Sequence, residues 1–276
     1  MSNLKEKSDE EKAIANIHDE LNQLSPSGKK RVLEKFVLAA LGSIPWIGGF
    51  ISTMATLKTD ESNLQTDSLQ TRWLKEHEKK MAKLTKSIND IAQRFESLGG
   101  SIDERLQSEE YLDVVRKAFR TWDKADTDEK RKFVANLISN SAGTSLCSDD
   151  VVRLFIDWLD VYHESHLSII REIYQNPGIT RQGIWTNING QLVREDSAEA
   201  DLFKRLIRDL STDGVIRQKR DINYAGEFKK KKRAARRSSS STMTSAFEET
   251  KEYELTELGK QFVHYAMNEA VTRVDY

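Results

Sequence analysis

An uncharged stretch near the N-terminus, "FVLAALGSIPWIGGFISTMATL", limits most strongly what this chain can fold into. It covers residues 36–57, which are 22 residues without a charge in a chain whose residues are 32% charged. As one straight helix it would be about 33 Å long, which is enough to cross the hydrocarbon core of a bilayer. So much apolar surface has to be covered by lipid, by the rest of the chain or by a partner.

The middle of this stretch argues against a single straight helix. The segment "GSIPWIGG" at 42–49 places Pro45 among three glycines, and both residue types interrupt helices. The apolar residues on either side recur at the same helical spacing, so the stretch predicts two short amphipathic helices joined by a turn. The apolar side chains of this hairpin are Val37, Leu38, Leu41, Ile44, Trp46, Phe50, Ile51, Met54 and Leu57.

Three environments suit such a hairpin. It can fill the core of the protein's own helical bundle, insert into a membrane either constitutively or when triggered, or contact another copy of the chain. Small residues on its second face allow close helix packing in lipid and in a soluble core alike. Lys35 and Lys58 flank the stretch at both ends, which suits a re-entrant hairpin better than a single span, and Trp46 suits a membrane interface.

A heptad repeat follows the hairpin and predicts a long helix over residues 67–98. Its apolar residues recur in steps of three and four, and Gly99 and Gly100 end the pattern. We expect a homo-oligomer held together by this seam, with packing inside the protein's own bundle as the alternative. The seam consists of Met81, Leu84, Ile88, Ile91, Phe95 and Leu98.

Three further helical segments complete a mainly α-helical region. They are "SEEYLDVVRKAFRTWDKA", then "TDEKRKFVANLISNSA" with Thr127 as N-cap and acids in its first turn, and "SDDVVRLFIDWLDVYHE" starting at Ser148. Together with the long helix they predict a helical bundle. We divide the chain into an N-terminal helix and hairpin at 1–62, a bundle with the heptad helix at 63–163, and a C-terminal domain at 164–276.

The C-terminal domain has a different order of elements. Helical patterns at "SHLSIIREIY", "TRQGIWTNI" and "DSAEADLFKRLIRDL" precede a strand pattern at "VIRQ"; much later, "YELTELGKQFVHYAM" predicts a short strand and a final helix. Gly214 allows the third helix to end in the left-handed conformation. The segments "LIRDLSTDGVIRQ" and "YELTELGKQF" resemble the helix exit and returning wing strand of bacterial winged helix-turn-helix regulators of the MarR-like type. This resemblance implies a winged helix with a small β-wing, which binds nucleic acid or protein.

Two features set this domain apart from DNA-binding winged helices. Acidic residues, among them Glu195 and Glu199, open the third helix, where they oppose DNA phosphates. A long polar insert at 223–251 extends the wing, and we expect it to be disordered. Its basic run at 229–237 holds seven cations in nine residues, which suits a phosphate backbone or, as an alternative, an anionic lipid surface. The candidate nucleic-acid-binding residues are Lys204, Arg205, Arg208, Arg217, Lys219, Arg220, Lys229, Lys230, Lys231, Lys232, Arg233, Arg236 and Arg237.

The whole chain, with its "IPxIGG" hairpin, coiled helix, "EKR…AN" helix and winged-helix-like part, is similar to a set of uncharacterised bacterial proteins. That resemblance implies an association with phage-defence and stress loci. A single cysteine, Cys147, and an N-terminus without a secretory pattern predict a cytoplasmic protein, and the hairpin leaves association with the inner membrane open. The net charge of −1 gives no overall attraction to nucleic acid.

Sequence motifs of enzymes and cofactor sites are missing. The chain has no GxxxxGK[ST], HExxH, CxxC or GxSxG pattern, so we expect no catalytic residue, no metal and no cofactor. His163 and His166 stand three residues apart around Glu164. Two neighbouring ligands without a third make a weak metal site, and a polar patch at a domain junction is the simpler interpretation.

The leading interpretation is a non-enzymatic bacterial sensor or effector. In it the winged helix and the basic insert bind nucleic acid or protein, and the hairpin fills the core or engages a membrane. The alternative is a soluble DNA-binding transcription regulator with a helical dimerisation domain. A third class is an adaptor that contacts partner proteins through both the wing and the heptad seam.

Overall fold

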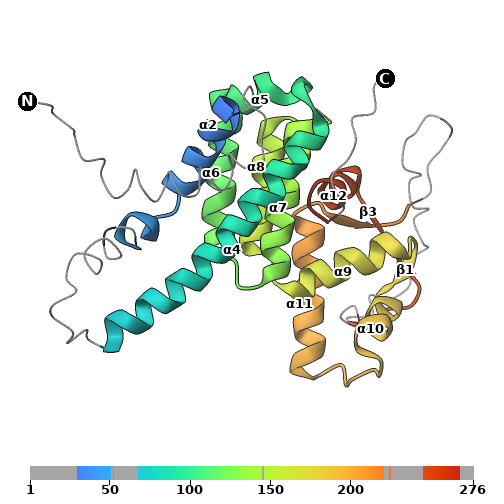
Figure 1. Ribbon diagram of the computed structural model, residues 1–276. Helices are drawn as coiled ribbons and strands as arrows, with labels where there is room; N and C mark the ends of the chain where they lie inside the picture. Colours follow the sequence, from blue (N-terminus) through green and yellow to red (C-terminus); the bar gives the residue numbers. More distant parts are fainter. Residues whose placement is uncertain are drawn as a thin grey trace, which may run out of the picture. The chain divides into compact units, whose positions relative to one another are not determined.

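The computed structural model describes residues 30–50, 52, 68–144, 146–220, 224 and 245–267 (Figure 1). Within them the chain is mainly helical and has one small antiparallel sheet of three strands. The chain divides into two compact units. The helical unit comprises Met1–Asp160 and Tyr265–Tyr276, and the inserted unit comprises Val161–His264. Several predictions fall outside the described residues: the N-terminal helix, the basic run at 229–237, and Ile51, Met54 and Leu57 of the hairpin.

The helices of the helical unit begin and end where local sequence signals place them. Ser108 accepts a hydrogen bond from the Tyr111 amide, and Thr127 accepts one from the Lys130 amide, so both act as N-caps. Gly99, with φ of 76°, ends the long helix as predicted. The elements are α2 (Lys30–Gly42), α4 (Ser68–Leu98), η1 (Gly100–Ile102), α5 (Asp103–Gln107), α6 (Glu109–Lys124), α7 (Asp128–Gly143) and α8 (Asp149–Val161).

Helix α7 forms the centre of the helical unit, and it is buried on nearly all sides (Figure 1). Such burial requires partners for its polar side chains. The amide of Asn136 donates to the Ala266 carbonyl at 3.0 Å, and the amide of Asn140 donates to the Tyr265 carbonyl at 2.8 Å. The last described residues of the chain therefore complete the hydrogen bonding of this central helix.

The heptad seam of α4 packs inside the chain. Leu84, Ile88, Ile91 and Phe95 are at most 4% exposed, and α4 packs against α7. Met81 and Leu98 are half-buried at the two ends of the seam. The structure corrects the expectation that this seam joins two copies of the chain, because its central side chains are already covered by the chain's own bundle.

The described part of the uncharged stretch also belongs to the core. Val37, Leu41, Ile44 and Phe50 are buried, whereas Leu38 is 46% exposed. Trp46 is half-buried, and its indole Nε1 donates to the Asp123 carboxylate at 2.7 Å. Among the described residues, no helix is both long enough and apolar enough to pass through a bilayer. Three environments were predicted for the hairpin. Its first half occupies one of them, the core of the protein's own bundle.

The described part of the inserted unit combines four α-helices with the small sheet. Strand β3 lies between β1 and β2 and pairs antiparallel with both, with Ile179 opposite Tyr253 and Ile216 opposite Leu255. The two-residue strand β1 was not predicted, because its sequence signal is too short. The elements are α9 (Glu164–Gln175), β1 (Ile179–Thr180), α10 (Arg181–Asn189), α11 (Ala198–Thr212), β2 (Ile216–Gln218), β3 (Glu252–Leu255), α12 (Glu257–Phe262) and the π-helix η2 (Val263–Met267), which ends in the helical unit.

The core of the inserted unit forms where α11 leads into β2. Gly214 has φ of 76°, as the predicted left-handed helix end requires. Phe203, Leu206 and Ile207 of α11 are buried, but Leu202 is 54% exposed. Leu202 therefore lies at the edge of the buried face of this helix.

Candidate functional site

The cations of α11, predicted to contact nucleic acid, are paired with carboxylates. Lys204 lies 3.3 Å from Glu195, and Arg205 lies 3.3 Å from Asp209. Arg208 lies 3.7 Å from the same Asp209. These pairs are largely exposed and contribute little to stability, but they neutralise the positive charge that α11 would present to a phosphate.

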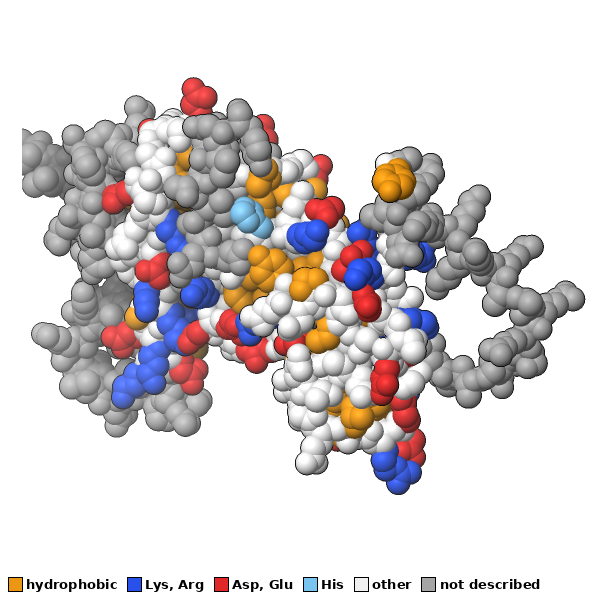
Figure 2. Space-filling view, turned by 90° about the vertical axis from the view of Figure 1, so that its right-hand side faces the viewer, with side chains coloured by type: hydrophobic (Ala, Val, Ile, Leu, Met, Phe, Trp, Pro, Cys, Tyr) orange, Lys and Arg blue, Asp and Glu red, His pale blue; other side chains and the backbone are white. Residues whose placement is uncertain are grey.

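The cations in β2 and directly after it, Arg217 and Lys219, are paired in the same way with residues of β3. Arg217 Nε lies 2.8 Å from Glu254, and Lys219 Nζ lies 2.7 Å from Glu252, both on β3. Arg220 follows Lys219 in the sequence. On the face of the molecule drawn in Figure 2, Lys and Arg side chains of the described residues are interspersed with Asp and Glu. The described cations of the predicted interface therefore do not form a surface of one sign.

The basic run at 229–237 belongs to the connection between β2 and β3 in the sequence. Beyond this run, the described residues begin again at Ser245. Hydrogen bonds fix the chain at this point. The Glu195 carboxylate accepts hydrogen bonds from the Ser245 hydroxyl and, at 3.1 Å, from the Ala246 amide. Glu195, expected to oppose DNA, has a structural role here, since it ties the returning chain to the start of α11.

The histidines of "HESH" form a stacked polar cluster. The ring of His166 stacks on Tyr162, with centroids 5.0 Å apart, and the Tyr162 hydroxyl donates to Asp213 at 2.8 Å. His166 Nδ1 accepts from the His163 backbone amide at 3.1 Å. No group of three or more metal-binding side chains occurs among the described residues. The cluster joins the start of α9 to the end of α11.

His166 makes the stability of the inserted unit dependent on pH. Burial and the neighbouring His163 lower the pKa of His166, Arg205 adds to this effect, and Asp209 and Asp213 partly oppose it. The unfolded chain therefore binds the proton more readily than the folded chain. The free energy of unfolding should be at its full value above the ordinary histidine pKa of about 6.5 and should decrease as the pH falls below it.

Replacement of His166 by glutamine should reduce this loss of stability at low pH. Urea unfolding at a series of pH values between about 7.5 and 5 would measure it. His163→Gln is the matched control, since His163 is exposed, and it should retain most of the dependence. An equal pH dependence in the wild type and in His166→Gln would contradict this role for His166.

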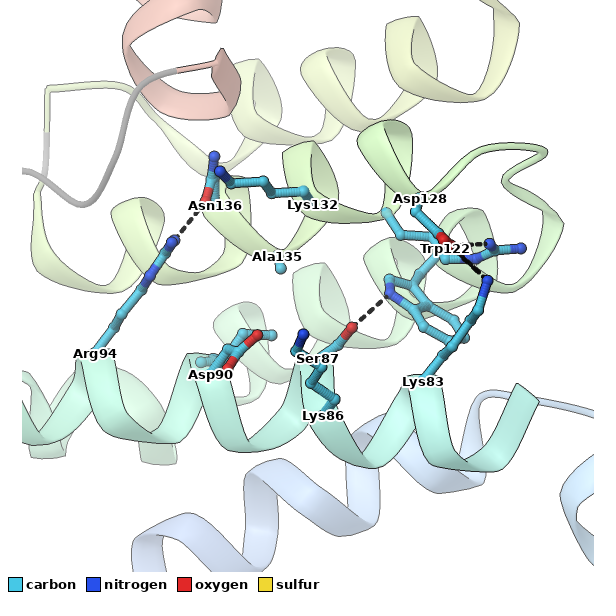
Figure 3. Close-up of a pocket in the computed structure, with 12 residues that line it drawn as sticks. Lys83, Lys86, Ser87, Asp90, Arg94, Trp122, Asp128, Lys132, Ala135 and Asn136 are labelled. Carbon is cyan, nitrogen blue, oxygen red and sulfur yellow. Dashed lines mark hydrogen bonds and ion pairs between the residues drawn. The ribbon is translucent and has the colours of Figure 1, made fainter. Parts of the chain in front are cut away.

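A cationic pocket in the helical unit was not predicted from the sequence. It lies between α4 and α7 (Figure 3) and has a volume of about 500 Å³. Its apolar lining residues include Ile91, Ala135 and Trp122. Five cations and two carboxylates line it, an excess of three positive charges. The charged residues are Lys83, Lys86, Arg94, Arg131 and Lys132, with Asp90 and Asp128.

At one end of this pocket, a carboxylate neutralises positive charge. Lys83 Nζ lies 2.9 Å from the Asp128 carboxylate, and Arg131 lies 2.7 Å from it. Hydrogen bonds from Lys83 and Arg131 lower the pKa of Asp128. Arg131 also donates to the Ala125 carbonyl at 2.6 Å and lies over the ring of Trp122, 5.3 Å from its centroid. This end is a closed network of charge and hydrogen bonds.

The other end of the pocket has Arg94, Lys132 and Lys86 with one carboxylate, Asp90, which stands one turn from both Lys86 and Arg94 on α4 (Figure 3). Arg94 reaches across from α4 and donates to the neutral side chain of Asn136 on α7 (Figure 3). Lys132 lies one turn before Asn136 on the same face of α7. Within the described part of the chain, Lys132 and the nearby Lys86 make no hydrogen bond or ion pair. Positive charge is therefore available to a ligand at this end.

The sequence does contain a signal for this pocket. Lys83, Lys86, Asp90 and Arg94 recur at helical spacing beside the heptad seam, and such charged stripes are ordinarily solvated faces. The cations of "TDEKRK" at the start of α7 also have the pattern of a solvated helix face. Only the packing of α4 against α7 brings the two charged stripes together.

Comparisons with known proteins add no family to this description. No family model matches the chain, and neither a curated protein nor a solved structure matches it.

Proposed function

We propose that the protein binds nucleic acid through its inserted unit, which we assign as a winged helix. The observation that carries this proposal is the order of elements, α9–β1–α10–α11–β2–β3, with β3 central in the sheet. In a winged helix the connection between the last two strands forms the wing. Here that connection contains the basic run at 229–237, with its seven cations.

We propose that the wing, and not α11, supplies the contacts with phosphate. Within Ala198–Thr212, three cations face three carboxylates, and each of the cations lies within 4 Å of a carboxylate. A phosphate at α11 would have to compete with these carboxylates and would meet Glu199 and Asp201 in the first turn. The basic run faces no such competition in its own sequence, because it contains no acid.

The wider role in this proposal is that of a bacterial sensor or effector. The resemblance of the whole chain to proteins of phage-defence and stress loci supports it. The hairpin has a structural part in this role, since Val37, Leu41 and Ile44 are buried in the helical unit. Engagement of a membrane by the hairpin would require these side chains to leave the core.

The test compares salt dependence in two variants. Wild-type protein should bind labelled DNA or RNA with a slope of log K against log salt of about −6, as seven phosphate contacts imply. Replacing all seven cations of 229–237 by glutamine should bring the slope close to zero and weaken binding at low salt by about a hundredfold or more. Fluorescence anisotropy over a range of salt concentrations measures both quantities.

The matched control changes three cations elsewhere in the same unit. Lys204→Ala, Arg205→Ala and Arg208→Ala together should leave affinity and slope nearly unchanged, because these cations are already paired. A transcription regulator that reads DNA through α11 predicts the opposite: loss of sequence-specific binding in this triple variant. Unchanged binding by the variant of the basic run would refute the proposed role of the wing.

A further inference from the structure

The cationic pocket between α4 and α7 has features that the binding of nucleic acid by the inserted unit does not explain. It lies wholly within the helical unit, so it is a different site from the wing. Its two carboxylates do not balance its five cations, and Arg94 and Lys132 lie beside Asn136 (Figure 3). A pocket of about 500 Å³ falls within the range of small-molecule sites.

The hydrogen-bond donors at the end of the pocket near Asn136 suit a phosphate group. Arg94 uses one nitrogen for Asn136, which leaves the other donors of its guanidinium for a second acceptor. Lys86 and Lys132 add two ammonium groups from facing helices. Guanidinium and ammonium groups together are the side chains that proteins use to hold phosphate.

The rest of the pocket suits the remainder of such a ligand. Ile91 and Ala135 form an apolar floor between the two ends. A ligand with a flat body would cover Ile91 and Ala135.

We propose that this pocket binds a small molecule carrying two or more linked phosphates, of the nucleoside diphosphate or triphosphate kind. The phosphates lie beside Arg94 and Lys132, and the nucleoside lies over Ile91 and Ala135. The helical unit is then a ligand-binding unit. This inference is independent of the proposed winged helix, because no residue of the inserted unit takes part.

Isothermal titration calorimetry on the full chain tests the proposal with four probes: ATP, ADP, inorganic pyrophosphate and adenosine. ATP and ADP should bind, pyrophosphate should bind more weakly because it leaves the apolar floor uncovered, and adenosine should not bind measurably. Lys132→Glu should weaken the binding of ATP by about tenfold or more, since it replaces a phosphate contact with a repulsion. Lys132 is exposed and unpaired within the described chain, so this variant should fold normally.

Two further variants separate a specific site from general attraction to positive charge. Arg94→Gln should also lose about tenfold in the affinity for ATP. Lys117→Gln with Lys124→Gln removes two cations of α6 outside the pocket, which pair with Asp157 and Asp160, and should bind ATP like the wild type. Equal losses in the α6 variant and the Lys132 variant would overturn the proposal.

The remaining outcomes are equally decisive. Absence of binding by both nucleotides and by pyrophosphate at about 1 mM would overturn the proposal. Binding that is unchanged in Lys132→Glu and Arg94→Gln would place the ligand elsewhere and overturn it as well. The variant of the basic run at 229–237 should bind ATP normally, so failure of the wing hypothesis and failure of the pocket hypothesis give different results.

Discussion

Replacing Phe36 with alanine is expected to lower the free energy of unfolding of the helical unit by about 3–5 kcal/mol. Phe36 is fully buried, and its ring makes edge-to-face contacts with Phe95 and Phe119, at centroid distances of 5.2 and 6.0 Å. The truncation leaves a cavity where three rings meet, and it removes these aromatic contacts as well. Urea unfolding followed by circular dichroism would measure the loss.

The control for this change lies on the same helix. Leu38 of α2 is 46% exposed, so Leu38→Ala should change the free energy of unfolding by no more than about 0.5 kcal/mol. A comparably small effect of Phe36→Ala would mean that α2 does not belong to the core, and it would return the hairpin to its membrane interpretation. Vesicle flotation of the wild type would then be the direct measurement.

Replacing Gly259 with alanine is expected to destabilise the inserted unit by about 3 kcal/mol or more. An added Cβ would lie 2.2 Å from the carbonyl oxygen of Val215, which is a backbone atom and has no rotamer to change. That oxygen also accepts a hydrogen bond from the Thr256 amide at 3.0 Å. The substitution therefore pushes α12 away from the start of β2 and breaks the contact that closes the unit.

Hydrogen exchange measured by mass spectrometry would locate this effect. Amides of α11 and β2 should exchange faster in Gly259→Ala, while amides in the centre of α7 should change much less. Gly42→Ala is the matched control, since a Cβ at Gly42 would meet no atom within 4 Å. Normal protection of β2 in Gly259→Ala would show that the close approach of the two backbones is not required.

Local signals in the sequence predicted the helices well. The heptad pattern with its terminal glycines placed α4 within one residue of its observed bounds, Ser68–Leu98. The N-cap at Thr127 was predicted and is observed. Each of these features depends on residues a few positions apart, where the geometry of one helix turn decides the outcome.

The environment of an apolar face could not be predicted in the same way. A stripe such as Leu84, Ile88 and Ile91 suits the chain's own bundle, a second copy or, in the hairpin, a lipid surface. The environment of the stripe depends on which distant residues pack against it in the folded chain, and here these residues come from α7. The cationic pocket was missed for the same reason, since α4 and α7 each carry an unremarkable charged face.

The charges of α11 show a further limit of the sequence. Lys204, Arg205 and Arg208 could be assigned to a nucleic-acid interface because pairing between side chains is not visible in composition. The structure places Glu195 and Asp209 beside them. Charge pairing is set by rotamers and by loop geometry, so a count of cations overestimates the field that a helix presents.

The return of the chain to the helical unit after residue 264 has a consequence for its synthesis on the ribosome. Asn136 and Asn140 belong to the middle of the chain, but their acceptors are the carbonyls of Ala266 and Tyr265. A nascent chain that has reached residue 160 therefore holds most of the helical unit, but not the backbone carbonyls of Ala266 and Tyr265 that bond to α7. The first unit to begin folding is the last to be finished, and a ribosome that stalls anywhere within the inserted unit leaves both units incomplete.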